Sequence, residues 1–156
     1  RHVGHVLQRG ADMLEVGNGG MTVPEYEAHF SFWCLLAAPL MAGNDLRNMN
    51  DSIKNILTNK EAIAVNQDAK GVQGSKILDE GNFEVWKKPL ANGDWAVILF
   101  NRGEAVVLAD LSWKSLNLGK SLNSRDLLSK TNLGKTNGFK GEIPSHQVRF
   151  FRLSKN

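Results

Sequence analysis

Neither disulfide bonds nor membrane-spanning segments can be expected from this sequence. Its single cysteine, Cys34, has no second cysteine to pair with and lies in an apolar run, so we expect a small buried core residue. No stretch approaches the ~18 consecutive apolar residues that a membrane span requires, and the N-terminus lacks an apolar segment of signal-peptide length. The sequence therefore predicts a soluble chain without disulfides.

The charge is nearly balanced, which argues against a nucleic-acid partner. The net charge is only +3, and the basic residues are scattered, Lys87 and Lys88 being the densest pair. A nucleic-acid-binding surface would be more densely basic. The 156 residues, 42% of them hydrophobic and 22% charged, have globular composition and exclude a disordered or collagenous chain.

The first part of the chain alternates short apolar runs with amphipathic stretches. Residues 12–16 predict a strand, which ends at the glycine-rich residues 17–20. A capping box at residues 22–25 (TVPE) then predicts the start of a helix that ends at Pro39. A strand followed by a helix is the repeating unit of α/β folds.

A second helix and two further strands complete this part. Residues 40–42 form a short apolar run, Asp51 predicts the N-cap of a helix, and residues 62–65 (AIAV) predict a third buried strand. Continuous apolar strands separated by helices are typical of a parallel sheet covered on both faces. Since three such strands leave two unpaired edges, residues 11–68 predict part of a larger α/β fold.

Beyond residue 74 the apolar positions alternate, which is typical of antiparallel strands. Two such runs, at residues 83–85 and 95–99, flank a turn that contains Asn92-Gly93 and predict a hairpin. Residues 122–128 show only a weak helical period. Further strands are predicted at residues 105–108, 111–113 and 148–153. This pattern predicts an antiparallel β-sandwich domain.

Polar residues accompany the three strands predicted in the first part. Asp12 begins the first strand, Asn44 and Asp45 follow the second, and residues 66–68 (NQD) follow the third. Active sites of α/β barrels lie at the carboxyl ends of the strands, so these residues are candidates for one polar rim. The alternative interpretation is that Asp45 and Asp68 cap turns.

Three other motifs give no cofactor or metal site. Residues 17–22 (GNGGMT) end in Thr22, where a dinucleotide-binding fingerprint requires Gly or Ala. Residues 134–136 (GKT) lack the first glycine of a phosphate-binding loop and predict a turn. His2 and His5 have no supporting ligand nearby, so we expect neither a metal nor a cofactor.

Several blocks of sequence occur in an order and spacing that are specific to one enzyme family. They are residues 12–21 (DMLEVGNGGM), 38–47 (APLMAGNDLR), 59–68 (NKEAIAVNQD), 72–74 (VQG), 85–90 (VWKKPL), 95–97 (WAV) and 100–102 (FNR). These blocks resemble the α-galactosidases (melibiases) of glycoside hydrolase family 27, and the resemblance covers about residues 12–153.

The resemblance implies an α/β plus all-β fold. Residues 11–74 would be the last strands and helices of an incomplete (β/α)8 TIM barrel, and residues 75–156 a C-terminal antiparallel β-sandwich. Residues 1–10 form an unmatched N-terminal segment. As a consequence we expect the remaining barrel strands to expose apolar side chains that a complete barrel would cover, among them Leu14, Val16, Leu40, Ile63 and Val65.

The resemblance also implies retaining hydrolysis of terminal α-galactosyl residues by two aspartates. In the family these aspartates lie in Lys-Tyr-Asp and Asp-Ile-x-Asp-x-Trp settings, and this chain contains neither. No catalytic residue is therefore assigned, and we expect the chain alone to be inactive. Asp12 and Met13 match positions that line the family's sugar pocket, so α-galactosides are the partners that the resemblance implies.

A second hypothesis makes the chain a non-catalytic carbohydrate-binding or interaction module. Such a module would present exposed aromatic rings on which sugars stack. Trp86 and Trp95 are the candidates, yet both fall on the apolar alternation of the predicted hairpin. We expect them to be core or interface residues.

Overall fold

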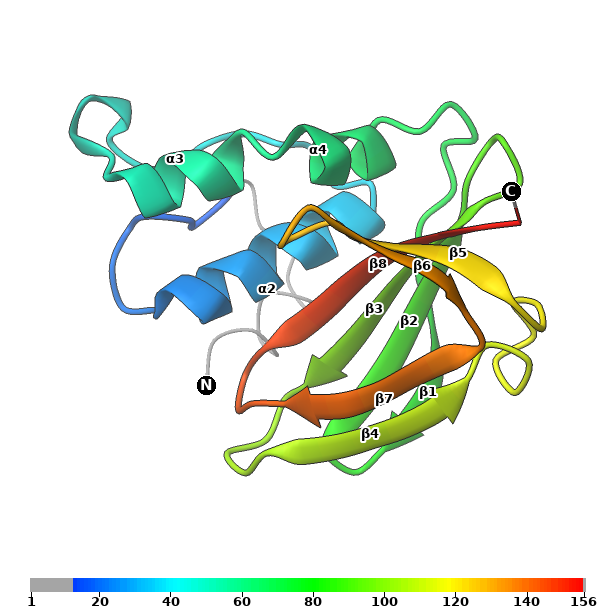
Figure 1. The fold of residues 1–156 in the computed structure, drawn as a ribbon. Coiled ribbons are helices and arrows are strands. Elements are labelled where there is room, and N and C mark those ends of the chain that lie inside the picture. The colour runs from blue at the N-terminus through cyan, green and yellow to red at the C-terminus, as the bar shows by residue number, and fades with distance from the viewer. Residues whose placement is uncertain (1–12, 156) are drawn as a thin grey trace.

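The computed structural model describes residues 13–155 as a layer of helices packed on a β-sandwich (Figure 1). The helices within this range are α2 (Val23–Leu35), η1 (Leu46–Asn48), α3 (Asp51–Leu57) and α4 (Lys60–Asn66). The strands are β1 (Ser75–Glu80), β2 (Phe83–Pro89), β3 (Trp95–Asn101), β4 (Val107–Ser112), β5 (Leu122–Asp126), β6 (Thr131–Thr136), β7 (Gly138–Ile143) and β8 (Val148–Ser154). None of the helices in the described range is long and apolar enough to cross a membrane.

The strands form two antiparallel sheets, as the sequence predicts. The larger sheet has six strands in the order β1-β2-β3-β8-β5-β6, and the smaller sheet pairs β4 with β7. The predicted hairpin is confirmed, because β2 pairs with β3 from Phe83 opposite Asn101 to Pro89 opposite Trp95. Gly93 in its turn has φ +88°, a conformation that favours glycine.

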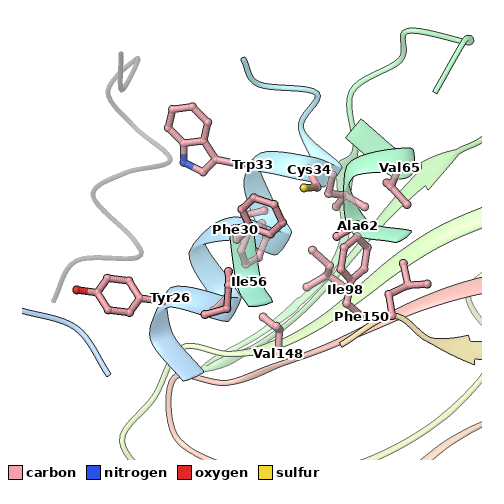
Figure 2. Packing of buried hydrophobic residues seen from close by; sticks show 14 of the residues in the cluster. Tyr26, Phe30, Trp33, Cys34, Ile56, Ala62, Val65, Ile98, Val148 and Phe150 are labelled. Atoms are coloured by element: carbon pink, nitrogen blue, oxygen red, sulfur yellow. The ribbon is translucent and has the colours of Figure 1, made fainter. Parts of the chain in front are cut away.

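Strand β3 is buried along both of its faces. Ile98 and Phe100 point into a core shared with the helices, whereas Val97 and Leu99 point into a core shared with β4 and β7. Phe32 of α2 meets the ring of Phe100 edge-on at a centroid distance of 5.2 Å. Figure 2 shows this helix-side core, in which Ile98 and Phe150 of the sheet lie among side chains of α2, α3 and α4.

Helix α2 begins at the predicted capping box. Glu25 N donates to the Thr22 hydroxyl, and Thr22 N donates to a Glu25 carboxylate oxygen at 2.7 Å. The helix ends at Leu35 rather than at Pro39, because Ala37 adopts a left-handed conformation with φ +53°. Likewise the N-cap of α3 is Asn50 rather than the predicted Asp51.

The prediction of a third strand is wrong, because residues 62–65 lie in helix α4. Asn59 caps that helix by accepting from the N–H groups of Glu61 and Ala62. A four-residue apolar run has no period that distinguishes a buried strand from a buried helix turn. The first two predicted strands survive as extended segments joined by one parallel bridge between Leu14 and Ala42.

One prediction in the second part is also wrong, because residues 134–136 belong to strand β6 instead of a turn. The weak helical period at residues 122–128 does not mark a helix, since these residues contain strand β5. Strand β6 is exposed along nearly its whole length, so no apolar alternation marks it in the sequence. Gly134 has φ +72° and lies opposite Ser124, where a bulge interrupts the β5–β6 pairing.

Most of the side chains expected to be uncovered are buried. Leu14, Val16 and Val65 are at most 2% exposed, and Leu40 and Ile63 are partly buried. All of these residues pack in the helix-side core, which joins side chains of α2, α3 and α4 to side chains of the sheet. Cys34 is fully buried in the same core, as predicted, and burial raises the pKa of its thiol.

Truncating β3 on its helix-side face tests the shared core. Ile98 is fully buried, so Ile98→Ala should lower the free energy of unfolding by about 2–5 kcal/mol in urea denaturation. Leu108→Ala is the control because Leu108 is 77% exposed, and its effect should stay within about 0.5 kcal/mol. A small effect of Ile98→Ala would contradict this packing.

The capping box predicts a pH-dependent contribution to stability. The backbone hydrogen bond from Thr22, with the His146 contact at 3.0 Å, lowers the pKa of Glu25. A carboxyl whose pKa is lowered in the folded state stabilises the fold at pH values above its ordinary pKa. This stabilisation is lost as the pH falls through the lowered pKa. Glu25→Gln should therefore cost about 1 kcal/mol at pH 7 and progressively less as the pH falls towards 3, measured by urea denaturation. An equal cost at both pH values would contradict this.

Candidate functional site

The two extended segments around Leu14 and Ala42 form the edge of a parallel β-structure. Leu14 N donates to Met41 O at 2.7 Å, and Gly43 N donates to Leu14 O at 3.1 Å. Helix α2 connects the two segments, so they and the helix make a β-α-β unit whose strands end at the same edge. We call the rim the residues that follow these segments, Asn18, Gly43 and Asn44, together with Met13, whose Cβ would lie 3.3 Å from a Cβ on Gly43.

The rim is packed so closely that glycine is required in it. A Cβ atom on Gly43 would lie 2.7 Å from Leu14 O and 3.3 Å from the Cβ of Met13. A Cβ atom on Gly17, whose φ is +86°, would lie 2.9 Å from Ile53 Cγ2 and 3.2 Å from Asn44 Nδ2. The absence of a side chain at Gly17 and Gly43 therefore lets the loop after the first segment pack directly against the second segment and the loop that follows it.

One rim acceptor is left without a hydrogen-bond donor. Among residues 13–155, Oδ1 of Asn44 is the buried side-chain oxygen for which the structure gives no partner. Met13 packs against Gly43, the residue before Asn44, and its side chain is 48% exposed. The rim therefore offers a carboxamide next to an accessible apolar side chain. The second residue assigned from the sequence, Asp12, lies outside the described residues.

Helix α2 holds the glycine-rich loop through two side chains that the sequence analysis did not single out. Gly19 N donates to the Tyr26 hydroxyl at 2.7 Å, and Glu15 N donates to His29 Nε2 at 3.3 Å. Burial lowers the pKa of His29 to about 4, so its imidazole is neutral and can accept this bond at neutral pH. In the sequence, only the three-residue spacing of Tyr26 and His29, which places both on the buried face of the predicted helix, could have indicated this role.

The turn-capping interpretation of Asp45 and Asp68 is confirmed. Asp45 caps η1 by accepting from Arg47 N at 3.0 Å, and the hydrogen bond from the Arg47 side chain lowers the pKa of the Asp45 carboxyl. Asp68 accepts from Lys70 N at 3.0 Å and from Ala91 N at 2.9 Å. Both carboxylates are used to order loops.

The proposed grouping of residues 66–68 with the rim is wrong. Asn66 Nδ2 donates to Trp33 O at 3.2 Å and to Ala38 O at 2.8 Å, so Asn66 lies at the end of α2. The chain enters the second extended segment there, whereas the rim lies where that segment ends. The error has the same cause as the wrong strand at 62–65, because these residues follow a helix.

The two candidate tryptophans are partly buried, as expected. Trp86 packs against the helix-side core, where Phe32 meets it edge-on at 5.4 Å, and its Nε1 donates to Glu84. Trp95 packs against the sandwich core beneath Lys87, whose Nζ lies 4.8 Å from the ring centroid. In the described part of the chain, the large apolar side chains that are exposed are valine, leucine and methionine.

A metal centre finds no support in the part of the chain that the structure describes. Across residues 13–155, no three His, Cys, Asp or Glu side chains gather closely enough to hold a metal ion. His2 and His5, which the sequence analysis considered as a pair, lie outside the described residues.

Comparison with known proteins gives matches along most of the chain. Residues 4–68 match the family model described as α-galactosidase A, and residues 80–153 match that of the α-galactosidase C-terminal β-sandwich domain. The first match begins within residues 1–10, for which the sequence analysis found no resemblance. An α-galactosidase of Cyamopsis tetragonoloba is 43% identical over 146 residues, which cover 92% of this chain but 36% of that protein.

Solved structures share the same architecture. The crystal structure of α-galactosidase I from Mortierella vinacea matches with a TM-score of 0.84 at 36% identity, over 91% of this chain and 38% of that one. A glycoside hydrolase family 27 β-L-arabinopyranosidase from Geobacillus stearothermophilus matches with a TM-score of 0.84 at 28% identity, over 92% of this chain and 36% of that one.

These matches define the architecture as the end of a TIM barrel followed by an antiparallel β-sandwich, as the sequence analysis predicted. The chain belongs to the α-galactosidases of glycoside hydrolase family 27 and corresponds to their C-terminal part. It spans 36% of the length of the Cyamopsis relative.

Two glycines of the rim loop provide a matched test of the close packing. Gly17 and Gly19 have φ values of +86° and +89°, so alanine pays a similar backbone cost at either position. Only the Gly17 Cβ would collide with Ile53 and Asn44, whereas nothing lies within 4 Å of a Gly19 Cβ. Gly17→Ala should destabilise by about 1–3 kcal/mol more than Gly19→Ala in thermal unfolding. Equal effects would contradict the packing.

Proposed function

We propose that this chain is the C-terminal part of an enzyme that hydrolyses terminal α-D-galactosyl residues in galactosides. Family membership is the observation that carries the proposal. Residues 11–74 are then the last strands and helices of the catalytic barrel, and residues 75–156 are the C-terminal β-domain. The family match that begins at residue 4 counts against treating residues 1–10 as a segment outside both. The β-α-β unit and the sandwich described above are consistent with this division.

In this proposal Asp12 and Met13 contact the sugar beside the rim. The position of Met13 supports the assignment, because its exposed side chain adjoins the rim where barrel enzymes carry their active sites. An apolar side chain can pack against the hydrophobic face of a sugar ring while a neighbouring carboxylate accepts hydrogen bonds from its hydroxyl groups.

The chain alone is proposed to be inactive. Retaining glycosidases require two carboxyl groups about 5 Å apart, one as nucleophile and one as acid and base. The sequence contains neither of the aspartate settings that the family uses for these roles. Galactosyl specificity is part of the proposal, since the family also includes the β-L-arabinopyranosidase from Geobacillus stearothermophilus.

The alternative of a carbohydrate-binding module on the sandwich is not favoured. Sugar binding by stacking requires an accessible aromatic face, and Trp86 and Trp95 are both partly buried in the two cores. A titration of tryptophan fluorescence with galactose, melibiose and a polysaccharide is expected to leave the emission of the chain unchanged.

The proposal is tested by measuring turnover of an aryl α-galactoside by the purified 156-residue chain. No release of the aryl group above the uncatalysed rate is expected. Asp12→Asn serves as the comparison, because its carboxylate is the one that the proposal places against the sugar. Measurable turnover that Asp12→Asn abolishes would contradict the assignment of both catalytic carboxylates to other parts of the enzyme.

A further inference from the structure

A cavity of about 350 Å³ opens between helix α2, helix α3 and the turn that joins β5 to β6. Glu27, Ser52, Asn55, Asn59 and Lys130 are its polar lining residues, and its apolar wall includes Ile56 and Leu128. Cavities of this volume are typical of small-molecule sites. None of the rim residues lines it, so it is separate from the sugar pocket proposed above.

Glu27 is the residue in this cavity that folding alone does not explain. Its carboxyl is half-buried, and burial, together with the negative charge of Asp126, raises its pKa. Asp126 is committed elsewhere, because its Oδ1 accepts from the N–H groups of Leu128 and Ser129. Within residues 13–155 the structure gives no ion pair to Glu27. A half-buried carboxylate that has a second carboxylate nearby and makes no ion pair costs stability, which is typical of ligand-binding positions.

The remaining lining residues indicate the chemistry of the ligand. Lys130, at a left-handed turn position with φ +56°, also lines the cavity, so the lining carries one group of each charge sign and suits a neutral molecule. Ser52 and Asn55 lie three residues apart on α3 and face the same side. Hydroxyl, carboxamide, carboxylate and ammonium groups around an apolar wall match a ring that carries several hydroxyl groups.

We propose that this cavity is a second, non-catalytic site for a neutral saccharide, in which the Glu27 carboxylate accepts hydrogen bonds from two neighbouring sugar hydroxyls. The Asn55 carboxamide and the Lys130 ammonium bind further hydroxyls, and Ile56 and Leu128 contact the ring. The site lies on the helix layer and uses no exposed aromatic ring.

The binding test uses the full 156-residue chain and nuclear magnetic resonance titration with D-galactose and D-glucose. Signals of Asn55 and Lys130 should shift in a saturable way. Glu27→Gln should weaken binding by about 10–100-fold, because it removes charged hydrogen bonds. Asn55→Ala should also weaken binding, whereas the control Glu80→Gln, at an exposed glutamate of β1, should have no effect.

Thermal unfolding provides a readout that a structural role would not give. Because the pKa of Glu27 is raised in the folded state, its negative charge destabilises the fold at pH values above the ordinary pKa of a carboxyl group. Glu27→Gln should therefore raise the melting temperature at pH 7 while it weakens sugar binding. A lowered melting temperature would show a structural carboxylate and overturn the proposal.

Two further outcomes would overturn it. If the sugars shift only the signal of Met13, the second site is refuted while the proposed function stands. If calcium alone shifts Asn55 and Lys130 and the sugars do not, Glu27 and Asp126 hold a cation instead.

Discussion

The burial of strand β3 on both faces is the constraint on which the rest of the structure depends. Its odd and even positions point into different cores, one under the helices and one under β4 and β7. Strand β8 repeats the pattern next to it, with Phe150 opposite Ile98 on the helix side and Phe151 opposite Val97 on the sandwich side. The central sheet therefore belongs equally to the barrel-derived helices and to the β-domain.

Polar contacts across the helix–sheet boundary reinforce this shared core. Lys88 is fully buried, and its Nζ donates to Val65 O at the end of α4 at 2.6 Å. Burial lowers the pKa of Lys88 because the ammonium has lost its water. Asn59 Nδ2 donates to Leu127 O at 2.9 Å, and Glu61 pairs with Arg125. Removing either layer would leave buried polar groups unpaired, which is costly.

Sequence reasoning succeeded where local chemistry decides the structure. The capping box at Thr22 and the Asn-Gly turn of the hairpin fix their elements through residues close in the chain. The run at residues 62–65 and the exposed strand β6 were misread because long-range packing decides both. Strand β3 gives another example, since the alternation of apolar positions predicts a strand but does not predict the second layer that covers its other face.

The candidate rim was predictable only in part. The two glycine-rich loops and Met13 follow from the sequence, but the contacts that join them, such as Gly17 against Ile53, require the fold. In the sequence Tyr26 and His29 resemble ordinary core residues. Their role depends on hydrogen bonds to Gly19 and Glu15, which lie seven and fourteen residues away and meet them only in the folded chain. The cavity at Glu27 was invisible because its lining comes from two helices and a distant turn.

Native-state hydrogen exchange tests most directly whether the helices and the sandwich form one unit. If β3 is held from both sides, the most protected amides of α2 should open with the same free energy as those of β3 and β8, and with the same dependence on denaturant. Amides of α2 that open at a much lower free energy, while the sheet remains protected, would show that the sandwich is stable without its helical layer and would contradict this account.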